Sequence, residues 1–187
     1  NEVKGMLKIY IPPKEGWDDF KEEFISFDGQ TLCLEHSLVS ISKWEALWHK
    51  PFISKDEKTR QELISYIKCM TITQNVKDYA YNFLTNENIE IINKYLADSH
   101  TATWFSKDNS PKTNSSEQIT SELVYYWMIA NEIPFDPCEK WNFNRLRTLI
   151  RICSIKNNPG KKMKPKEVLR NQAMINKLRR AKLGTKG

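Results

Sequence analysis

Several residue types that build metal and cofactor sites are scarce in this sequence. The chain has three histidines and four cysteines, and no two cysteines form a C-x-x-C pair. A metal site needs His, Cys, Asp or Glu at helical or knuckle spacing, and no such cluster is present. We therefore expect no metal and no cofactor, and we expect reduced cysteines that act as small apolar residues. The residues concerned are His36, His49, His100, Cys33, Cys69, Cys138 and Cys153.

Glycine and long apolar runs are also in short supply. The six glycines are too scattered to form a loop whose successive backbone amides could cradle a phosphate, so nucleotide binding is not expected. The apolar runs are only a few residues long, which excludes a membrane-spanning helix. The N-terminus, Asn1 to Met6, lacks the charged-then-apolar pattern of a signal peptide, so we expect a cytoplasmic protein.

Catalytic motifs are missing as well. There is no G-x-S-x-G sequence, and no cysteine lies in a nucleophile signature. Glu35-His36 and His49 suggest a general base, but a base needs a partner within hydrogen-bond reach and a shifted pKa. We expect His36, at a strand end, and His49, at a helix end, to be surface or capping residues. The sequence therefore predicts a protein that is not an enzyme.

What the sequence does contain is enough apolar surface for a core, together with an uneven charge. Of its 187 residues, 40% are hydrophobic and 11% aromatic, which indicates a folded domain. Residues 156–187 hold eleven Lys or Arg against one acid, a net charge of +10, so the total of +6 leaves −4 on the other 155 residues. We expect a globular domain over residues 1–155 and a basic C-terminal helix or tail over 156–187.

Two stretches near the N-terminus predict β-structure. Residues 6–11 alternate between apolar and other side chains, and Pro12-Pro13 ends the pattern. In "EFISFDGQTLCLEH", Asp28-Gly29 stands between two apolar runs, as in a two-residue hairpin turn. We predict a small antiparallel hairpin or sheet at the N-terminus.

Helical spacing dominates the remainder, and we predict five to six helices in a mostly α, α+β fold. "SLVSISKWEALWHK" places Leu38, Ile41 and Trp44 three residues apart, on one face of a helix. Capping patterns predict further helix starts at Ser54 with Glu57, Asn86, Ser115 with Gln118, Asp136-Pro137-Cys138-Glu139, and Pro165 with Glu167.

Two regions are candidates for partner binding. Most aromatic residues lie on apolar helical stripes, but Trp104-Phe105 stands beside the polar stretch "SKDNSPKTNSSEQ", so we predict an exposed contact there. The cations of the basic segment could contact phosphates, bind an acidic protein surface, or keep a docked helix soluble. The candidate residues of this segment are Lys161, Lys162, Lys164, Lys166, Arg170, Lys177, Arg179, Arg180 and Lys182.

The order of several segments resembles a family of bacteriophage proteins. These segments are "LEHSLVSISKWEALWHKPF", "YIKCMTITQNV", "TATWF", "ELVYYWMIANEIPF", "WNFNRLRTLIRICSIKN" and the "NKLRRAKLGTKG" end. Over nearly the whole chain they are similar to small proteins encoded among the tail morphogenesis genes of tailed bacteriophages, the tail assembly chaperones. The resemblance implies a helical, non-enzymatic protein of the host cell cytoplasm. It also implies binding to the tape measure protein while the tail tube polymerises around it.

Two classes of function follow from the residues and the resemblance together. The first is a tail assembly chaperone, or a structural tail component of the virion, that works through contacts with tape measure or tail tube proteins. The second is a DNA-binding phage protein that uses the basic segment. No zinc-finger, RRM or homeodomain signature accompanies the charge, so we expect any nucleic-acid binding to be weak and non-specific.

We expect the intact protein to bind duplex DNA weakly at physiological salt, because the basic segment carries charge without a base-reading motif. Contacts with about six phosphates would make the logarithm of the binding constant fall with the logarithm of the salt concentration, with a slope near −5. Titration of fluorescent duplex DNA over a series of salt concentrations measures this slope. Tight binding at physiological salt that disappears when residues 156–187 are removed would contradict the chaperone hypothesis.

Overall fold

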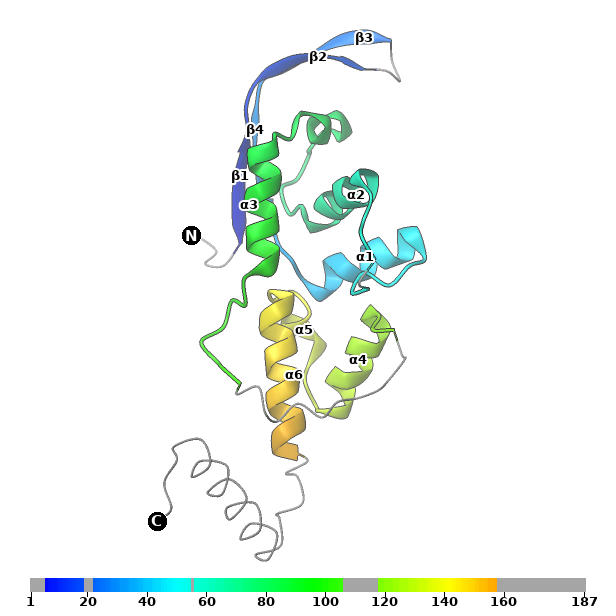
Figure 1. Ribbon diagram of the computed structural model, residues 1–187, viewed down its shortest axis with the longest axis vertical. Helices are drawn as coiled ribbons and strands as arrows, with labels where there is room; N and C mark the ends of the chain where they lie inside the picture. Colours follow the sequence, from blue (N-terminus) through cyan, green and yellow to red (C-terminus); the bar gives the residue numbers. More distant parts are fainter. Residues whose placement is uncertain (1–5, 19–21, 55, 106–117, 158–187) are drawn as a thin grey trace, which may run out of the picture. The chain divides into compact units, whose positions relative to one another are not determined.

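The computed structural model describes residues 6–18, 22–54, 56–105 and 118–157. The chain divides into two units, Asn1–Ile152 and Cys153–Gly187, and each is considered by itself. The basic residues 158–187, including the helix predicted to start at Pro165, lie outside the described residues. Strands come first and helices follow (Figure 1), which confirms the predicted α+β fold.

The helices follow the strands in the order α1 to α6. Their bounds are α1 Leu38–Trp48, α2 Arg60–Met70, the 3-10 helix η1 Asp78–Phe83, α3 Asn86–Ala97, α4 Ser121–Ala130, α5 Phe135–Cys138 and α6 Phe143–Asn157.

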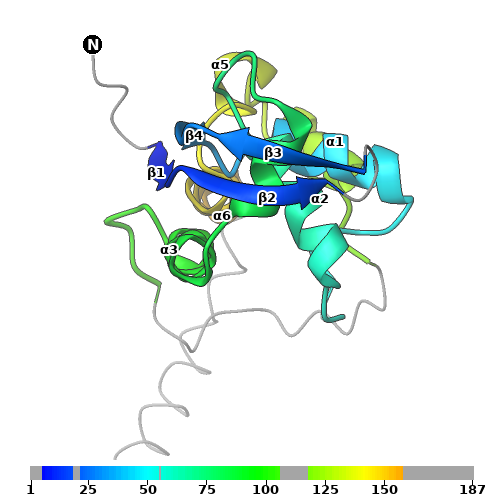
Figure 2. The ribbon, with the colours of Figure 1, turned by 90° about the horizontal axis from the view of Figure 1, so that it is seen from above.

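The strands form one long two-stranded ribbon with a break in its middle. Strand β1 (Leu7–Ile11) pairs with β4 (Gln30–Leu34), and we name this pair the proximal ribbon. Strand β2 (Lys14–Asp18) pairs with β3 (Glu23–Phe27), and we name this pair the distal ribbon (Figures 1 and 2). Both pairs are antiparallel and keep one register, so the distal ribbon continues the proximal one.

The predicted hairpin turn at Asp28-Gly29 is therefore wrong. The chain reverses between β2 and β3, and Asp28-Gly29 lies opposite Pro12-Pro13 in the break between the two strand pairs. Proline has no backbone N–H, so the ladder is interrupted at this point. Gly29 has a φ of 85°, and an added Cβ would lie 2.8 Å from the Tyr10 hydroxyl oxygen. The glycine thus permits a close approach in the ribbon instead of a reversal of the chain.

The proximal ribbon contributes one side of the core. Ile9, Ile11, Leu32 and Leu34 are buried, and they alternate with more exposed neighbours as strand geometry requires. Helix α3 packs against β1. The buried amide of Asn88 donates a hydrogen bond of 3.1 Å to the carbonyl of Tyr10 and ties this helix to the ribbon.

Helix α1 buries the stripe that its spacing predicts, but the capping motifs of the next two helices differ from the prediction. Leu38, Ile41 and Trp44 are almost fully buried. Helix α2 is capped by Thr59 with Glu62 instead of Ser54 with Glu57, because "TRQE" repeats the same capping-box pattern closer to the helix.

Helices α3 and α4 also begin beside the predicted caps. Thr85 and Asn88 form the capping box of α3, so Asn86 is its first residue instead of its cap. Thr120 caps α4, whose backbone becomes helical at Ser121. The predicted cap at Ser115 lies outside the described residues, and the start at Ser121 replaces the one expected from Gln118.

The predicted helix start at Asp136 is also wrong. Asp136 lies in the short α5 with a non-helical ψ of 127°, and its carboxylate pairs with the Lys140 ammonium. The long helix α6 begins after Asn142, whose side-chain oxygen accepts a hydrogen bond of 3.0 Å from the Asn144 N–H. Asn142 therefore supplies the acceptor that the sequence pattern assigned to Asp136.

This correction leads to a stability prediction. We expect Asn142→Ala to lower the free energy of unfolding by about 1 kcal/mol, because one N–H of the first turn of α6 loses its acceptor. Asn142→Ser keeps an acceptor and should restore most of the loss, while Asp136→Ala should have a smaller effect because its ion pair is exposed. Urea denaturation followed by circular dichroism measures all three. A larger effect for Asp136→Ala than for Asn142→Ala would contradict the structure.

Candidate functional site

Trp104 is the most exposed large apolar side chain among the described residues. It is 83% exposed. Phe105 is only partly exposed, because the Arg151 guanidinium lies over its ring with a distance of 4.0 Å to the centroid. The structure thus separates a pair that the sequence treats as one feature: Trp104 is free for contact, and Phe105 holds the segment to α6.

The segment before Trp104 is also attached to α6. The side-chain amide of Asn144 donates hydrogen bonds of 3.0 Å and 2.7 Å to the carbonyls of Leu96 and Asp98. His100 contacts Tyr95 through an edge-to-face ring pair and a 3.2 Å hydrogen bond to its carbonyl. An anchored backbone presents the exposed indole, which lowers the entropy cost of binding a partner.

The distal ribbon carries a second exposed aromatic pair, which sequence reasoning missed. Trp17 is 53% exposed and Phe24 is 79% exposed. They lie opposite each other on the two strands, with ring centroids 5.2 Å apart in an edge-to-face arrangement. A signal was present in the spacing of Phe24 and Phe27, because residues three apart on a strand face opposite sides and only one of them can be buried.

The other face of the distal ribbon is held by η1. Phe27 stacks on Phe83 with centroids 5.2 Å apart and meets Tyr79 edge-on. Gly16 allows this contact, because an added Cβ would lie 2.8 Å from the Phe83 ring. A hollow of ≈ 160 Å³ between β2 and η1 is lined by Trp17, Tyr79 and Phe83 among others.

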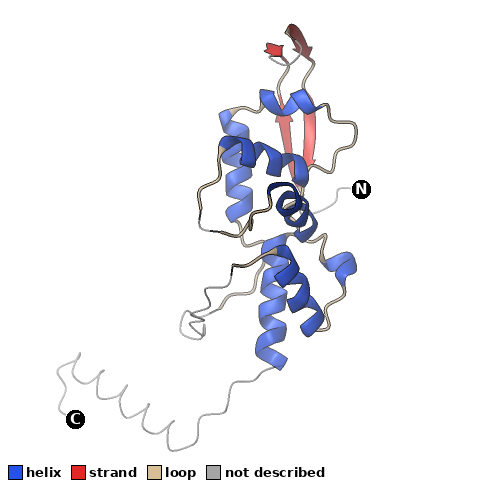
Figure 3. Ribbon diagram, turned by 90° about the vertical axis from the view of Figure 1, so that its right-hand side faces the viewer, coloured by secondary structure: helices blue, strands red, loops and turns tan. Residues whose placement is uncertain are grey.

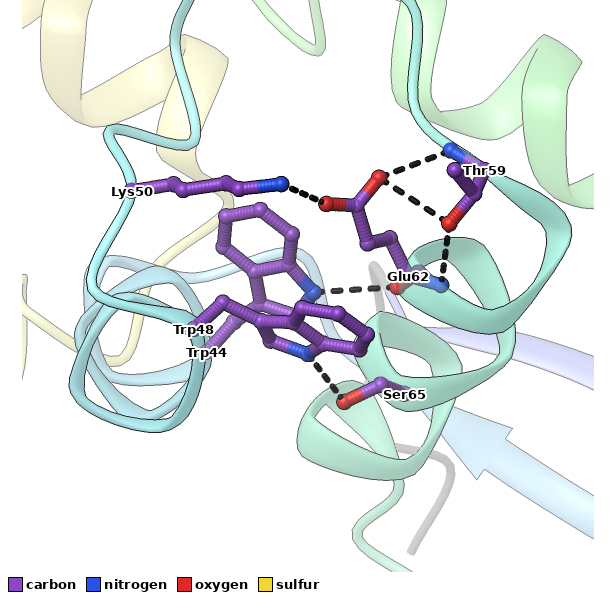
Figure 4. A network of polar contacts seen from close by, with 6 residues as sticks. All are labelled: Trp44, Trp48, Lys50, Thr59, Glu62 and Ser65. Atoms are coloured by element: carbon purple, nitrogen blue, oxygen red, sulfur yellow. Dashed lines mark hydrogen bonds and ion pairs between the residues drawn. The ribbon is translucent and has the colours of Figure 1, made fainter.

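A polar network joins α1 to α2 (Figure 4). The Glu62 carboxylate accepts hydrogen bonds from the Lys50 ammonium and the Thr59 N–H, both at 2.7 Å. The Trp44 indole N–H donates 2.9 Å to the Glu62 carbonyl, and the Trp48 indole N–H donates 2.9 Å to the Ser65 hydroxyl. The hydrogen bond from Lys50 and that from Thr59 lower the pKa of Glu62 to about 2.

A hollow of ≈ 380 Å³ lies beside this network, and the two lysines that line it already have partners. Lys50 pairs with Glu62, and the Lys58 ammonium lies 4.6 Å from the Phe52 ring centroid and 5.8 Å from that of Trp44. Burial lowers the pKa of Lys58, while Glu62 and Asp56 oppose the shift. These contacts join two helices and a loop, so we assign the network a structural role.

A buried titratable cluster lies where the proximal ribbon meets α2, α3 and α6. His36 Nδ1 and the Tyr66 hydroxyl are 2.5 Å apart, and the Tyr95 hydroxyl donates 2.8 Å to Glu35. Burial lowers the pKa of His36 to about 4, with His100 and Arg147 adding to the shift, and burial raises the pKa of Glu35.

This cluster corrects one of two expectations about the histidines. His36 is buried and packs against the rings of Tyr66 and Phe143, so its predicted surface position is wrong. His49 is the C-cap of α1 with a left-handed backbone, as expected for a capping residue.

The described part of the chain carries neither a metal-binding cluster nor a membrane-spanning helix. Within residues 6–18, 22–54, 56–105 and 118–157, no group of three His, Cys, Asp or Glu side chains could hold a metal ion. No helix in this part of the chain has the length and apolar character needed to cross a membrane. The basic candidate residues from Lys161 to Lys182 lie outside the described residues. The candidate contact regions are therefore two separate ones, Trp104 with Phe105 and the distal ribbon.

The low pKa of Glu62 predicts a pH-dependent contribution to stability. We expect Glu62→Gln to lower the urea midpoint at neutral pH, because the ionised carboxylate binds Lys50 and Thr59 more strongly than an amide does. The folded-state pKa lies below the ordinary value, so this stabilisation is present above the ordinary carboxyl range and is lost as pH falls from about 4.5 towards about 2.

Urea titrations of both proteins between neutral pH and acid measure this difference. The gap between the wild-type and Glu62→Gln midpoints should close over the acid range. Glu90→Gln, at an exposed position of α3, is the matched control. A gap that stays constant down to the acid end would show that the Glu62 charge is not the cause.

Comparison with known proteins gives no family for this chain. It matches no protein-family model, no curated protein and no solved structure. Its function is therefore inferred from its own residues and from the order of its sequence segments.

Proposed function

We propose that this protein is a non-enzymatic bacteriophage tail assembly protein that acts as a chaperone for tape measure or tail tube proteins. The observation that carries the proposal is Trp104, an indole that is 83% exposed on a segment anchored by Asn144 and Arg151. Tryptophan is enriched among the residues that dominate binding energy at protein interfaces. Trp17 and Phe24 add exposed aromatic area at a second position.

The resemblance of segment order to tail assembly chaperones supplies the class of partner. A tape measure or tail tube subunit would expose apolar surface before assembly, and exposed aromatic side chains suit such a surface. Under this proposal the protein acts in the host cell cytoplasm during tail morphogenesis. If the same contacts with tail proteins persist in the finished virion, the protein is a structural tail component instead.

A DNA-binding phage protein is the second candidate. The net charge of +10 on residues 156–187 favours it, because clustered Lys and Arg release counterions when they contact phosphates. Retained binding to a tail protein after the basic segment has been neutralised would favour the chaperone over this candidate.

The proposal predicts a direct complex that depends on Trp104. When the protein is co-expressed with the tape measure or tail tube protein of the same phage, we expect a stable complex that is lost or weakened in Trp104→Ala. Truncation of an interface tryptophan commonly costs about 2 kcal/mol, or roughly thirtyfold in affinity. Calorimetry with the purified partner measures the change.

Tyr126→Ala is the matched control, because Tyr126 is an exposed aromatic residue on α4. Its affinity should remain close to that of the wild type. Deletion of the gene from the phage should leave filled heads without tails, visible by electron microscopy. Normal tails after deletion, or the absence of any complex with both tail proteins, would overturn the proposal.

A further inference from the structure

The outer edge of β2 has no partner strand among the described residues. Strand β2 pairs with β3 along one edge, and Figures 2 and 3 show no further strand beside this pair. No backbone–backbone hydrogen bond joins β2 to a described residue outside β3. Alternate residues of an edge strand direct their N–H and C=O groups away from the neighbouring strand. The outer edge of β2 therefore presents backbone donors and acceptors to which an extended chain can add.

The hollow of ≈ 160 Å³ between β2 and η1 follows this edge. Its lining residues are Lys14, Glu15, Gly16, Trp17, Tyr79, Asn82 and Phe83. Neighbouring residues of a strand point to opposite faces, so a hollow lined by four successive residues of β2 lies at the edge of this strand. No described side chain of β3 lines the hollow, so the edge is the outer one.

The size and the lining of the hollow suit one aliphatic side chain. The rings of Tyr79 and Phe83 are half-buried, and the exposed side chain of Asn82 completes the lining from η1. A cavity of about 150 Å³ with apolar walls holds a benzene molecule, so this hollow has room for a side chain such as that of isoleucine or leucine. Lys14 and Glu15 leave the lining without net charge, which does not favour a nucleic acid or an anionic lipid.

Gly16 gives such a side chain access to the hollow. A Cβ at this position would lie 2.8 Å from the Phe83 ring, so Gly16 belongs to the face of the ribbon that η1 covers. A residue opposite Gly16 on an added strand meets no side chain from this position, and its own side chain can lean between β2 and η1. Its two neighbours on the added strand then lie opposite Glu15 and Trp17, on the exposed face.

We propose that the outer edge of β2 binds an extended segment of another protein as a third, antiparallel strand. An isoleucine, valine or leucine of this segment lies opposite Gly16 and fills the hollow. A lysine or arginine opposite Glu15 and an acid opposite Lys14 complete the match, because opposite charges on facing strands attract. Backbone hydrogen bonds supply the affinity in such strand addition, and the hollow selects the side chain. This inference goes beyond the proposed function and does not depend on it, because it uses none of the contacts around Trp104.

The composition of β2 favours a different protein over a second copy. Two copies paired through β2 would place residues of "KEGWD" against the hollow, and this strand contains no aliphatic side chain. The hollow would then stay unfilled. A chain that pairs with β2 and also fills the hollow must therefore have an aliphatic residue between polar ones.

A peptide titration of the intact protein tests this inference. The probe is an acetylated and amidated hexapeptide of the sequence Thr-Tyr-Ile-Lys-Glu-Thr, which can place its Ile opposite Gly16 and its Lys opposite Glu15. We expect saturable shifts of the NMR amide signals of β2 and of the Trp17 indole signal, with a Kd of about 1 mM or lower. Replacement of Ile by Ala in the probe should weaken binding about tenfold, because less apolar surface then enters the hollow.

Two N-methylated probes separate strand addition from contact through side chains alone. Methyl groups on the amides of every second residue block hydrogen bonding along one edge of the probe, and methyl groups on the remaining amides block the other edge. We expect one of these probes to bind like the unmethylated probe and the other not to bind, because only one edge can face β2.

A variant of the protein tests the hollow itself. Asn82→Trp places a large ring at the hollow and should weaken binding of the probe at least about tenfold, because the space for the isoleucine is then occupied. Asn93→Trp makes the same substitution at an exposed position of α3 and is the matched control. It should bind the probe like the wild type.

Several outcomes would overturn the inference. The absence of any saturable shift up to about 5 mM probe would do so. Equal binding of the two methylated probes would show that the backbone edge is not used, and equal weakening by Asn82→Trp and Asn93→Trp would exclude the hollow. Shifts of β2 signals that depend on protein concentration without probe would show that a second copy occupies the edge instead.

Discussion

The packing of Phe83 against the distal ribbon is the constraint on which the exposed aromatic face of that ribbon depends. Its ring stacks on Phe27 and lies over Gly16, where any larger residue would collide with it. This contact fixes which face of the distal ribbon is covered. Because strand side chains alternate, the opposite face must then present Trp17 and Phe24 to solvent. A two-stranded ribbon is only marginally stable alone, so the support from η1 also keeps these rings in place.

Two carboxylates perform a similar positioning role inside the helical body. Glu45 is buried and accepts hydrogen bonds from the N–H groups of Phe52 at 2.8 Å and Ser121 at 2.7 Å, so it links α1 to the following loop and to α4. Glu62 links α2 to Lys50 after α1. Buried acids are costly unless they are fully hydrogen-bonded, and these two meet that condition with backbone donors and one ammonium. These two carboxylates therefore help to hold the helices and the loops of the body together.

Sequence patterns predicted the local features better than the pairing of distant ones. The α+β class and the buried stripe of α1 followed from periodicity, and the exposed Trp104 followed from its polar neighbours. The prediction of a hairpin turn at Asp28-Gly29 was wrong because strand pairing depends on residues far apart in the sequence. Pro12-Pro13 lies opposite Asp28-Gly29 and interrupts the pairing there. The predicted start of α6 was wrong because Asp136 matches a capping pattern in the sequence, while its own backbone is not helical. Trp17 and Phe24 were missed because nothing local shows that η1 covers the other face.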